Sequence, residues 1–186
     1  MAEQPLLLAL DQGTSSSRAA VFSSSGDLVT SASAPLPIAY PADGWVEQDP
    51  IAIWTSQRQA LVQLDSKLSD GQRKAVLSCG ITNQRETTVL WRRSSGLPCG
   101  PALVWQDGRT AAICEAWKQQ GLEQEWCRRT GLLLDPYFSA SKIRWMLDHY
   151  QDAQAAAASD DLCFGTVESW LLWQLTGGQR HGSDCL

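Results

Sequence analysis

The sequence predicts a mixed α/β fold in which a mixed β-sheet begins as an antiparallel meander and carries helices on its faces. Two observations lead to this prediction. Residues 6–34 hold three short runs separated by polar turns, and from residue 50 onward helical and strand patterns alternate. Such an order is typical of mixed sheets covered by helices. With 186 residues, 44% of them hydrophobic, the chain is long enough for one domain with a buried core.

Three strands are expected at the start of the chain. The apolar run Leu6–Leu10 and the run Arg18–Ser23 flank the polar turn Gly13–Ser17, and a third strand follows near Leu28–Ala34. Short polar turns join antiparallel neighbours, so these strands form a meander. Residues 35–50 are rich in proline and are expected to form a loop.

A first helix is expected to begin at Asp49 and Pro50, because aspartate is a favoured N-cap and proline a favoured first helical residue. It should run to about Lys67. Its predicted buried stripe contains four apolar side chains, Trp54, Leu61, Leu64 and Leu68. The mostly apolar segment Ala75–Ile81 follows and is predicted to be a central strand.

The rest of the chain alternates between the two kinds of element. Strands are expected at 87–91 and 162–165, and helices at 110–120 and 139–150. A final helix, with Thr166 as its N-cap, should run to about Leu175. Gly121 should close the first of these helices and Gly177 the last. The alanine run 155–158 is expected to be helical.

Charge and composition exclude several classes of protein. Lys and Arg total 15 and Asp and Glu total 20, and a net charge of -5 disfavours binding to nucleic acid or to anionic lipid. The apolar run at the start lacks a basic flank and stops at Asp11, so no signal peptide or membrane span is expected. The six cysteines form no C-x-x-C pair. We therefore expect no zinc site and reduced thiols in a cytoplasmic protein.

The turn from Asp11 to Arg18 is the first candidate site. A carboxylate ends a strand, Gly13 allows close backbone approach, and Thr14, Ser15 and Ser16 carry hydroxyls. Turn N–H groups and hydroxyls can hold phosphate oxygens, and one carboxylate can serve Mg²⁺. The alternative is an ordinary polar turn, and the residues alone leave it open.

Three further segments could hold a small polar ligand. In the polar insert 83–86, Arg85 can donate in a fork and Glu86 can accept, which suits adjacent hydroxyls. Trp105 could pack on a carbon skeleton, and the phenol of Tyr137 could add a hydrogen bond. A surface ion pair, a core tryptophan and a simple turn are the respective alternatives.

Together these segments resemble the amino-terminal part of the FGGY carbohydrate kinases. The resemblance is an ordered series over nearly the whole chain, namely Ala9–Thr14, Gly44–Pro50, Ile81–Thr88, Val104–Asp107, Asp135–Ser139 and Phe164–Val167. Within that family, the Asn-Gln-Arg-Glu and Asp-Pro-Tyr-Phe stretches point to glycerol as the substrate.

The resemblance implies a ribonuclease H-like fold of the actin and hexokinase type and ATP-dependent phosphorylation of glycerol to glycerol 3-phosphate. It implies that Thr14, Ser15, Ser16 and Arg18 contact nucleotide phosphate and that Asp11 serves Mg²⁺. It also implies that Arg85, Glu86 and Tyr137 hold the glycerol hydroxyls and that Trp105 lies against the carbons. A cytoplasmic, homo-oligomeric complete enzyme of glycerol catabolism is the corresponding expectation.

The chain also departs from the family. Family members are more than twice as long, and their catalytic base is an aspartate that would lie beyond Leu186. Asp160, Asp161 and Asp184 lie in surroundings unlike those of that base. We therefore expect residues 1–186 to be one truncated amino-terminal domain without a catalytic base, inactive by itself. The alternatives are another FGGY sugar or polyol kinase and a non-catalytic module that binds a polyol or a partner.

Overall fold

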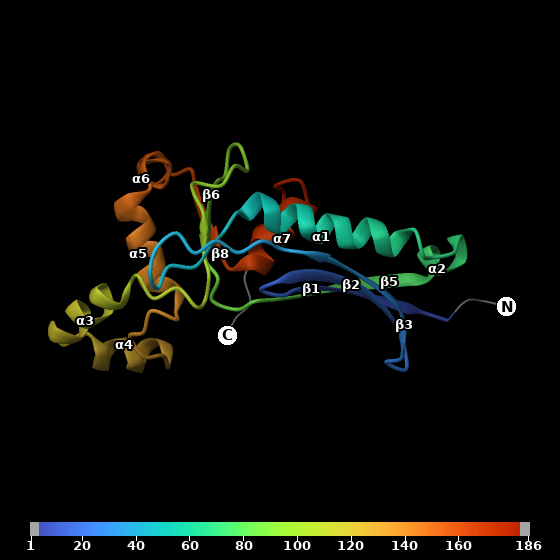
Figure 1. Ribbon diagram of the computed structural model, residues 1–186, viewed down its shortest axis with the longest axis horizontal. Coiled ribbons are helices and arrows are strands. Elements are labelled where there is room, and N and C mark those ends of the chain that lie inside the picture. Colours follow the sequence, from blue (N-terminus) through green and yellow to red (C-terminus); the bar gives the residue numbers. More distant parts are fainter. Residues whose placement is uncertain (1–3, 183–186) are drawn as a thin grey trace. The chain divides into compact units, whose positions relative to one another are not determined.

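The computed structural model describes residues 4–182, which form two compact units (Figure 1). The described part of unit 1 consists of residues 4–38 and 50–84, and that of unit 2 of residues 39–49 and 85–182. The chain thus leaves unit 1 twice, at residues 38 and 84. Asp184 and Cys185 lie outside the described residues.

Unit 1 is built on a four-stranded sheet with the strand order β3-β2-β1-β5. Its strands are β1 (Leu6–Gln12), β2 (Ser16–Ser23), β3 (Leu28–Pro35) and β5 (Val76–Asn83). Strands β1, β2 and β3 pair antiparallel in chain order, which confirms the predicted meander. Strand β5 pairs with β1 in parallel, so the sheet is mixed as expected.

Helix α1 (Pro50–Asp65) covers one face of this sheet (Figure 1). The predicted stripe is confirmed in part, because Leu64 is buried and Leu61 and Leu68 pack against the core. The buried face also includes Ser56, Gln57 and Ala60, which the stripe did not contain. The Gln57 Nε2 donates to the carbonyl of Arg18 at 3.2 Å, and the Ser56 Oγ donates to the carbonyl of Pro35 at 3.0 Å. Hydrogen bonds to strand carbonyls thus satisfy the donor groups of these two buried side chains. Hydropathy alone could not have indicated that these two polar side chains are buried.

Strand β5 corrects a second prediction. It lies at one edge of the described sheet rather than at its centre, and Leu77 is 70% exposed. An apolar run of this length is compatible with either position, so its composition could not place it. The short helix α2 (Asp70–Ala75) before it was not predicted, although Ser69 and Gln72 form a capping box that the sequence displays.

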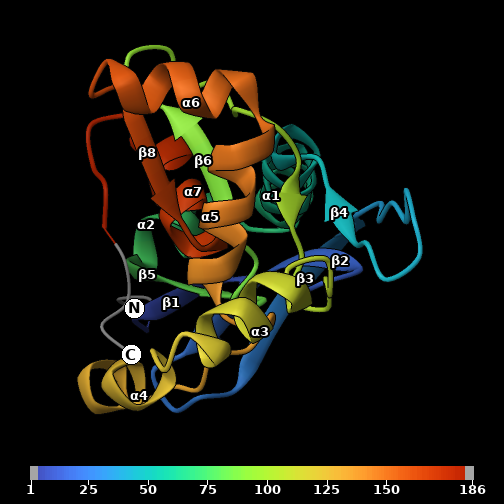
Figure 2. The same cartoon turned by 90° about the vertical axis from the view of Figure 1, so that its left-hand side faces the viewer.

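The described part of unit 2 contains two small antiparallel sheets and five helices. Strand β4 (Glu47–Gln48) pairs with β7 (Ala102–Leu103), and β6 (Val89–Arg92) pairs with β8 (Leu162–Gly165). The helices are α3 (Ala111–Gln119), α4 (Glu123–Thr130), α5 (Ser139–His149), α6 (Gln151–Ala158) and α7 (Val167–Leu175). Figure 2 shows α5, α6 and α7 around the β6–β8 pair. Most of these elements match the sequence-based expectations.

Three details of unit 2 differ from those expectations. The predicted loop 35–50 contains the two-residue strand β4, and α4 was not predicted. Thr166 occupies the N-cap position of α7, but its hydroxyl hydrogen bonds to the Glu168 carboxylate instead of to the helix backbone. A two-residue strand forms only beside its partner strand, and the hydrogen bond of a cap side chain depends on which acceptor lies nearby. The local sequence pattern reveals neither.

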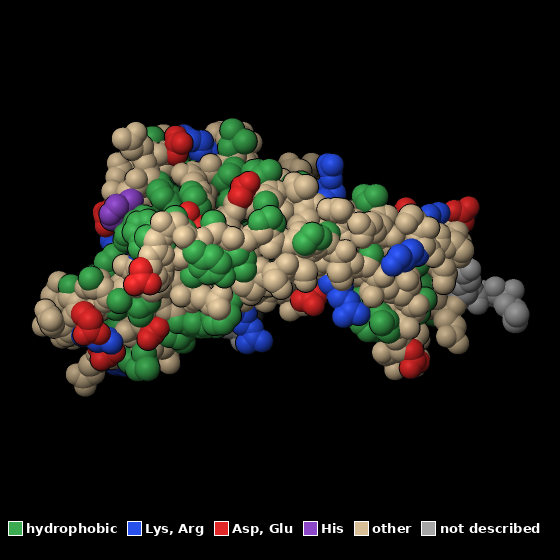
Figure 3. Space-filling model, viewed as in Figure 1, with side chains coloured by type: hydrophobic (Ala, Val, Ile, Leu, Met, Phe, Trp, Pro, Cys, Tyr) green, Lys and Arg blue, Asp and Glu red, His purple; other side chains and the backbone are tan. Residues whose placement is uncertain are grey.

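The surface and the cysteines add little that distinguishes the protein. Charges of both signs are scattered over the face in Figure 3. Within residues 4–182, no helix has the length and apolar content needed to cross a bilayer. Five cysteines in this range are free thiols: Cys79, Cys99, Cys114, Cys127 and Cys163.

Gly165, at the end of β8, allows close packing against α7. A Cβ built on Gly165 would lie 2.4 Å from the Cβ of Ser169. Gly165→Ala is therefore expected to lower the free energy of unfolding by about 1–3 kcal/mol, measured by urea denaturation. Gly80→Ala is the matched control, because a Cβ there meets no atom within 4 Å. Equal stability of the two variants would contradict the packing argument.

Candidate functional site

The turn between β1 and β2 is tight and is supported by buried polar groups. The N–H of Gly13 donates to the carbonyl of Ser16 at 2.9 Å, and a Cβ on Gly13 would lie only 3.0 Å from that oxygen. Next to the turn, the Ser17 Oγ donates to the Gln12 Oε1 at 2.9 Å, and both residues are fully buried. These contacts hold the turn in one conformation, which a ligand-binding loop requires.

The candidate phosphate and metal residues lie on this turn and beside it. Asp11 and Arg18 are directly opposite each other in the β1–β2 register, and both are exposed. Their neighbours Leu10 and Ala19 are buried in the core that contacts α1, so Asp11 and Arg18 point to the other face of the sheet. The register thus places an acidic and a basic residue opposite each other beside the turn, and the Arg18 guanidinium donates to the Ser31 Oγ at 3.3 Å.

The hydroxyl side chains of the hairpin surround its tip. Ser15 and Ser16 are exposed and Thr14 is half-buried. The carbonyl of Ser15 accepts the N–H of Leu36 at 2.9 Å, which holds the tip against the end of β3. The tip therefore offers hydroxyls to a ligand on a backbone that is already fixed.

The side chains of the hairpin could hold Mg²⁺ only if phosphate oxygens supplied further ligands. Within residues 4–182, no three His, Cys, Asp or Glu side chains gather closely enough to hold a metal ion. Asp11 makes no ion pair in this range. Mg²⁺ is commonly bound by one or two carboxylates together with phosphate oxygens and water, so a single free carboxylate beside a phosphate loop suits it.

In unit 2, Glu86 has an unusual backbone conformation next to Arg85. Its φ is 63°, in the left-handed region that residues other than glycine seldom adopt. Its carboxylate Oε2 accepts hydrogen bonds from the N and the Oγ of Ser139, at 3.2 and 3.1 Å. Ser139 is the first residue of α5, where the helix dipole favours a negative charge. Arg85 is exposed, and its side chain makes no hydrogen bond with any described residue.

Tyr137 and Trp105 form the aromatic part of the site. Their ring centroids lie 6.2 Å apart with an interplanar angle of 69°, and the side chains are partly exposed. The N–H of Tyr137 donates to the Asp135 Oδ1 at 2.8 Å, and the N–H of Trp105 donates to the Thr87 Oγ1 at 3.1 Å. The structure thus brings Trp105 beside Tyr137 and anchors the backbone of each.

Lys142 is a residue of this site that the sequence analysis missed. It is fully buried, and its Nζ donates to the carbonyl of Glu86 at 3.0 Å and to that of Tyr137 at 2.5 Å. Burial lowers the pKa of Lys142 to about 8, against the opposing effect of the carboxylates of Glu86, Asp107 and Asp135. A signal was available in the sequence, because Lys142 lies four residues before the buried Met146 on the same helix.

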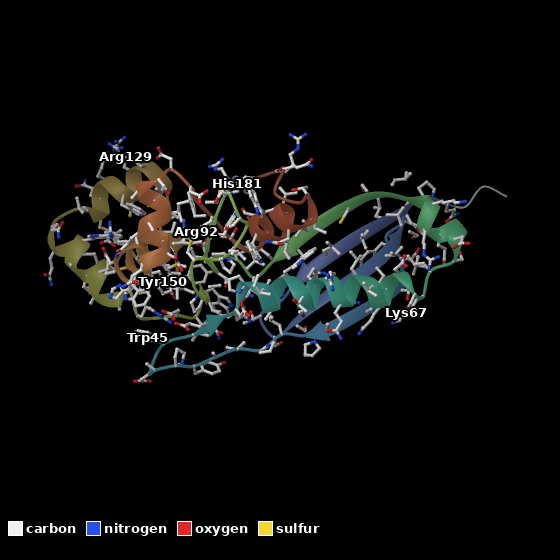
Figure 4. The ribbon with its side chains drawn as sticks, turned by 90° about the horizontal axis from the view of Figure 1, so that it is seen from above. Trp45, Lys67, Arg92, Arg129, Tyr150 and His181 are labelled. Carbon is white, nitrogen blue, oxygen red and sulfur yellow. The ribbon has the colours of Figure 1, made fainter. Side chains whose placement is uncertain are left out.

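Unit 2 also contains a buried charged cluster around Arg109. The Arg109 guanidinium contacts the Asp107 carboxylate at 2.7 Å and the Glu47 carboxylate at 2.8 Å. It also stacks on Trp45, with its Cζ 3.8 Å from the ring centroid. Trp45 in turn packs against Trp145 of α5, as does Tyr150, and Figure 4 labels Trp45 and Tyr150. The segment Gly44–Pro50 therefore contributes to folding.

These features define a class of protein, which comparison with solved structures supports. The structure of the glycerol kinase of Plasmodium falciparum with ADP matches with a TM-score of 0.84 at 28% identity, over 94% of this chain and 35% of that one. A gluconate kinase of Lactobacillus acidophilus matches in fold with a TM-score of 0.78 at 16% identity, over 92% and 33% of the two chains. The fold is that of the actin and hexokinase-like ATPases, as the sequence led us to expect.

Sequence comparison gives the family. Residues 6–185 match the model of the FGGY family of carbohydrate kinases, N-terminal domain, so the chain belongs to this family. The glycerol kinase of Ralstonia pickettii is 54% identical over 182 residues, and that of Rhodospirillum centenum is 51% identical over 188. These alignments cover 96% and 99% of this chain but only 36% and 37% of the relatives. The chain thus spans about a third of their length.

Proposed function

We propose that the protein containing this chain transfers a phosphoryl group from ATP to glycerol and forms glycerol 3-phosphate. The observation that carries the proposal is the cluster of Glu86, Tyr137 and Trp105 in unit 2, with Arg85 next to it in the chain. It combines a charged donor, a charged acceptor, a phenol and an apolar ring, which suits a small polyol. Relatives named glycerol kinase, about half identical over nearly the whole chain, support this choice of substrate.

Glu86, Tyr137 and Arg85 each have an atom available for a hydroxyl group. Glu86 uses Oε2 for Ser139, whereas its Oε1 makes no hydrogen bond with residues 4–182. The hydroxyl of Tyr137 and the guanidinium of Arg85 are likewise without partners in that range. In the proposed complex, Oε1 accepts from one glycerol hydroxyl, Arg85 and Tyr137 donate to others, and Trp105 covers the carbons.

The hairpin of unit 1 is proposed to bind the ATP phosphates. Thr14, Ser15 and Ser16 supply hydroxyls, Arg18 supplies positive charge, and Asp11 would hold Mg²⁺. When bound, the metal ion would neutralise phosphate charge, whereas phosphoryl transfer otherwise requires mainly alignment. The backbone N–H of Gln84 donates to the carbonyl of Gln12 at 2.7 Å, and the next residue in the chain is Arg85.

We assign no general base to residues 1–186. In the proposed reaction, the base belongs to the part of the relatives that this chain does not span. Residues 1–186 then form the amino-terminal domain, which positions the polyol and the phosphates. A cytoplasmic, homo-oligomeric enzyme is the corresponding proposal for the complete protein.

The decisive experiment measures ADP formation by the complete protein with glycerol, D-xylulose or gluconate as acceptor. We expect turnover with glycerol, and kcat/KM for glycerol that exceeds the values for the other two acceptors. Turnover with xylulose in place of glycerol would reassign the protein to another sugar kinase of the family. The isolated chain of 186 residues is the control. It should form no ADP, because a general base alone contributes about 10²–10⁴-fold to such a rate.

A further inference from the structure

Lys142 is a buried charge in unit 2 that makes no ion pair with any described residue and that the proposed reaction does not use. Lysine is almost never fully buried unless it is paired, and this one lies in the first turns of α5 with no exposed surface. No carboxylate lies within ion-pair distance of its Nζ among residues 4–182. Its two hydrogen-bond acceptors are both backbone carbonyls. A buried ammonium held in this way requires an explanation.

The two carbonyls belong to Glu86 and Tyr137, the residues proposed to hold the glycerol hydroxyls. Glu86 lies in the polar insert after β5, and Tyr137 lies in the turn before α5. The Nζ of Lys142 also lies 5.9 Å from the centroid of the Tyr137 ring. One ammonium group therefore joins two segments that are distant in sequence but adjacent in the folded chain.

The conformation of Glu86 explains why such a link is needed. A left-handed backbone at a residue other than glycine costs roughly 1–3 kcal/mol and persists only where the surroundings enforce it. Lys142 holds the carbonyl of Glu86, and Ser139 holds its Oε2. These two contacts hold the backbone and the carboxylate of Glu86 in place. The orientation of the other carboxylate oxygen, Oε1, is thereby fixed as well.

We propose that Lys142 is a positioning residue, which fixes Glu86 relative to Tyr137 and so preorganises the polyol site without touching the polyol. The inference rests on the proposed function, since it concerns the same site. The alternative is that Lys142 only stabilises the fold. The two predict different results, because a positioning residue affects glycerol far more than ATP.

The test compares Lys142→Met with Lys118→Met in the complete protein. Methionine has a similar length but no N–H donor, so the variant keeps most of the apolar packing and loses both hydrogen bonds to the carbonyls. Lys118 pairs with Glu115 on the surface of α3 and serves as the matched control. We expect Lys142→Met to lower kcat/KM for glycerol about tenfold or more, as misplacement of site groups by a fraction of an ångström does. The KM for ATP should stay within about twofold.

A second readout is independent of activity. The amide of Ser139, which donates to Glu86, should exchange its hydrogen about tenfold faster in Lys142→Met, while amides in the middle of α1 keep their rates. Unchanged exchange at Ser139, or equal acceleration throughout the protein, would overturn the positioning role. If the wild-type protein fails to phosphorylate glycerol, the proposed function falls, but the exchange result still decides whether Lys142 holds Glu86.

A third measurement needs no variant and covers the case in which Lys142→Met does not fold. In wild-type protein labelled with ¹⁵N-lysine, saturating glycerol should shift the Nζ resonance of Lys142. The reason is that Glu86 and Tyr137, whose carbonyls accept from this Nζ, would then bind glycerol. The Nζ resonance of Lys118 should not move. If the protein phosphorylates glycerol but the chemical shift of the Lys142 Nζ does not change when glycerol is added, the proposal is contradicted.

Discussion

Replacing Arg85 with alanine is expected to raise the KM for glycerol by about 10- to 100-fold, the largest kinetic effect that the structure predicts. Hydrogen bonds to charged groups contribute about 1.5–3 kcal/mol, and each 1.4 kcal/mol corresponds to a factor of ten. The Arg85 side chain has no hydrogen-bond partner among the described residues, so its removal leaves no buried group unpaired. The loss should therefore fall on the substrate and not on the fold, and steady-state kinetics with varied glycerol measures it.

Two variants make this result specific. Arg93→Ala removes another exposed arginine of unit 2, outside the proposed site, and should leave the KM for glycerol unchanged. Arg18→Ala removes the arginine of the hairpin and should raise the KM for ATP instead. An unchanged KM for glycerol in Arg85→Ala would mean that the polar insert is a surface turn.

Replacing Arg109 with alanine is expected to lower the free energy of unfolding by about 3–5 kcal/mol, the largest effect on stability. Removing one partner of a buried ion pair leaves the other charge uncompensated. The side chains of Arg109 and Asp107 are 1% and 0% exposed, so Asp107 would lose its guanidinium partner in a site without water access. Contacts of Arg109 with the rings of Trp45 and Trp145 would be lost as well.

Urea denaturation followed by tryptophan fluorescence measures this change. The control is Arg144→Ala, which removes a surface pair with Asp148 one turn away on α5. Exposed pairs of this kind contribute only about 0.3–0.5 kcal/mol. If Arg109→Ala were as mild as Arg144→Ala, the cluster around Trp45 would not be a determinant of stability.

Most of the fold could be predicted because its elements display local signals. The meander of β1, β2 and β3 shows polar turns between strands, and α1 begins at Pro50 as its start signal indicates. The edge position of β5 was not predictable, since an apolar sequence is compatible with a strand at the edge or at the centre of a sheet. The short pair β4–β7 was missed because only the partner strand makes two residues a strand.

The candidate site likewise contains residues that the sequence could indicate and one that it could not. Glu86, Tyr137 and Trp105 could be proposed from residue type and order, and the structure brings them together in unit 2. Their roles toward glycerol, and those of Arg85 and of the hairpin residues toward ATP, stay predictions. Lys142 escaped notice because a lysine within an amphipathic helix is expected at the surface.

The sequence by itself determined where most strands and helices form, which polar segments interrupt them and to which family the resemblance points. These properties depend on neighbours along the chain, whose spacing fixes helical and strand periodicity. Only the tertiary structure decided that Lys142 links Glu86 to Tyr137. It alone also decided that Gln57 is buried on a strand carbonyl and that Arg109 contacts two tryptophan rings. Apart from the bond between Lys142 and Tyr137, these are contacts between residues far apart in sequence. Such contacts exist only once the backbone has brought their partners within reach.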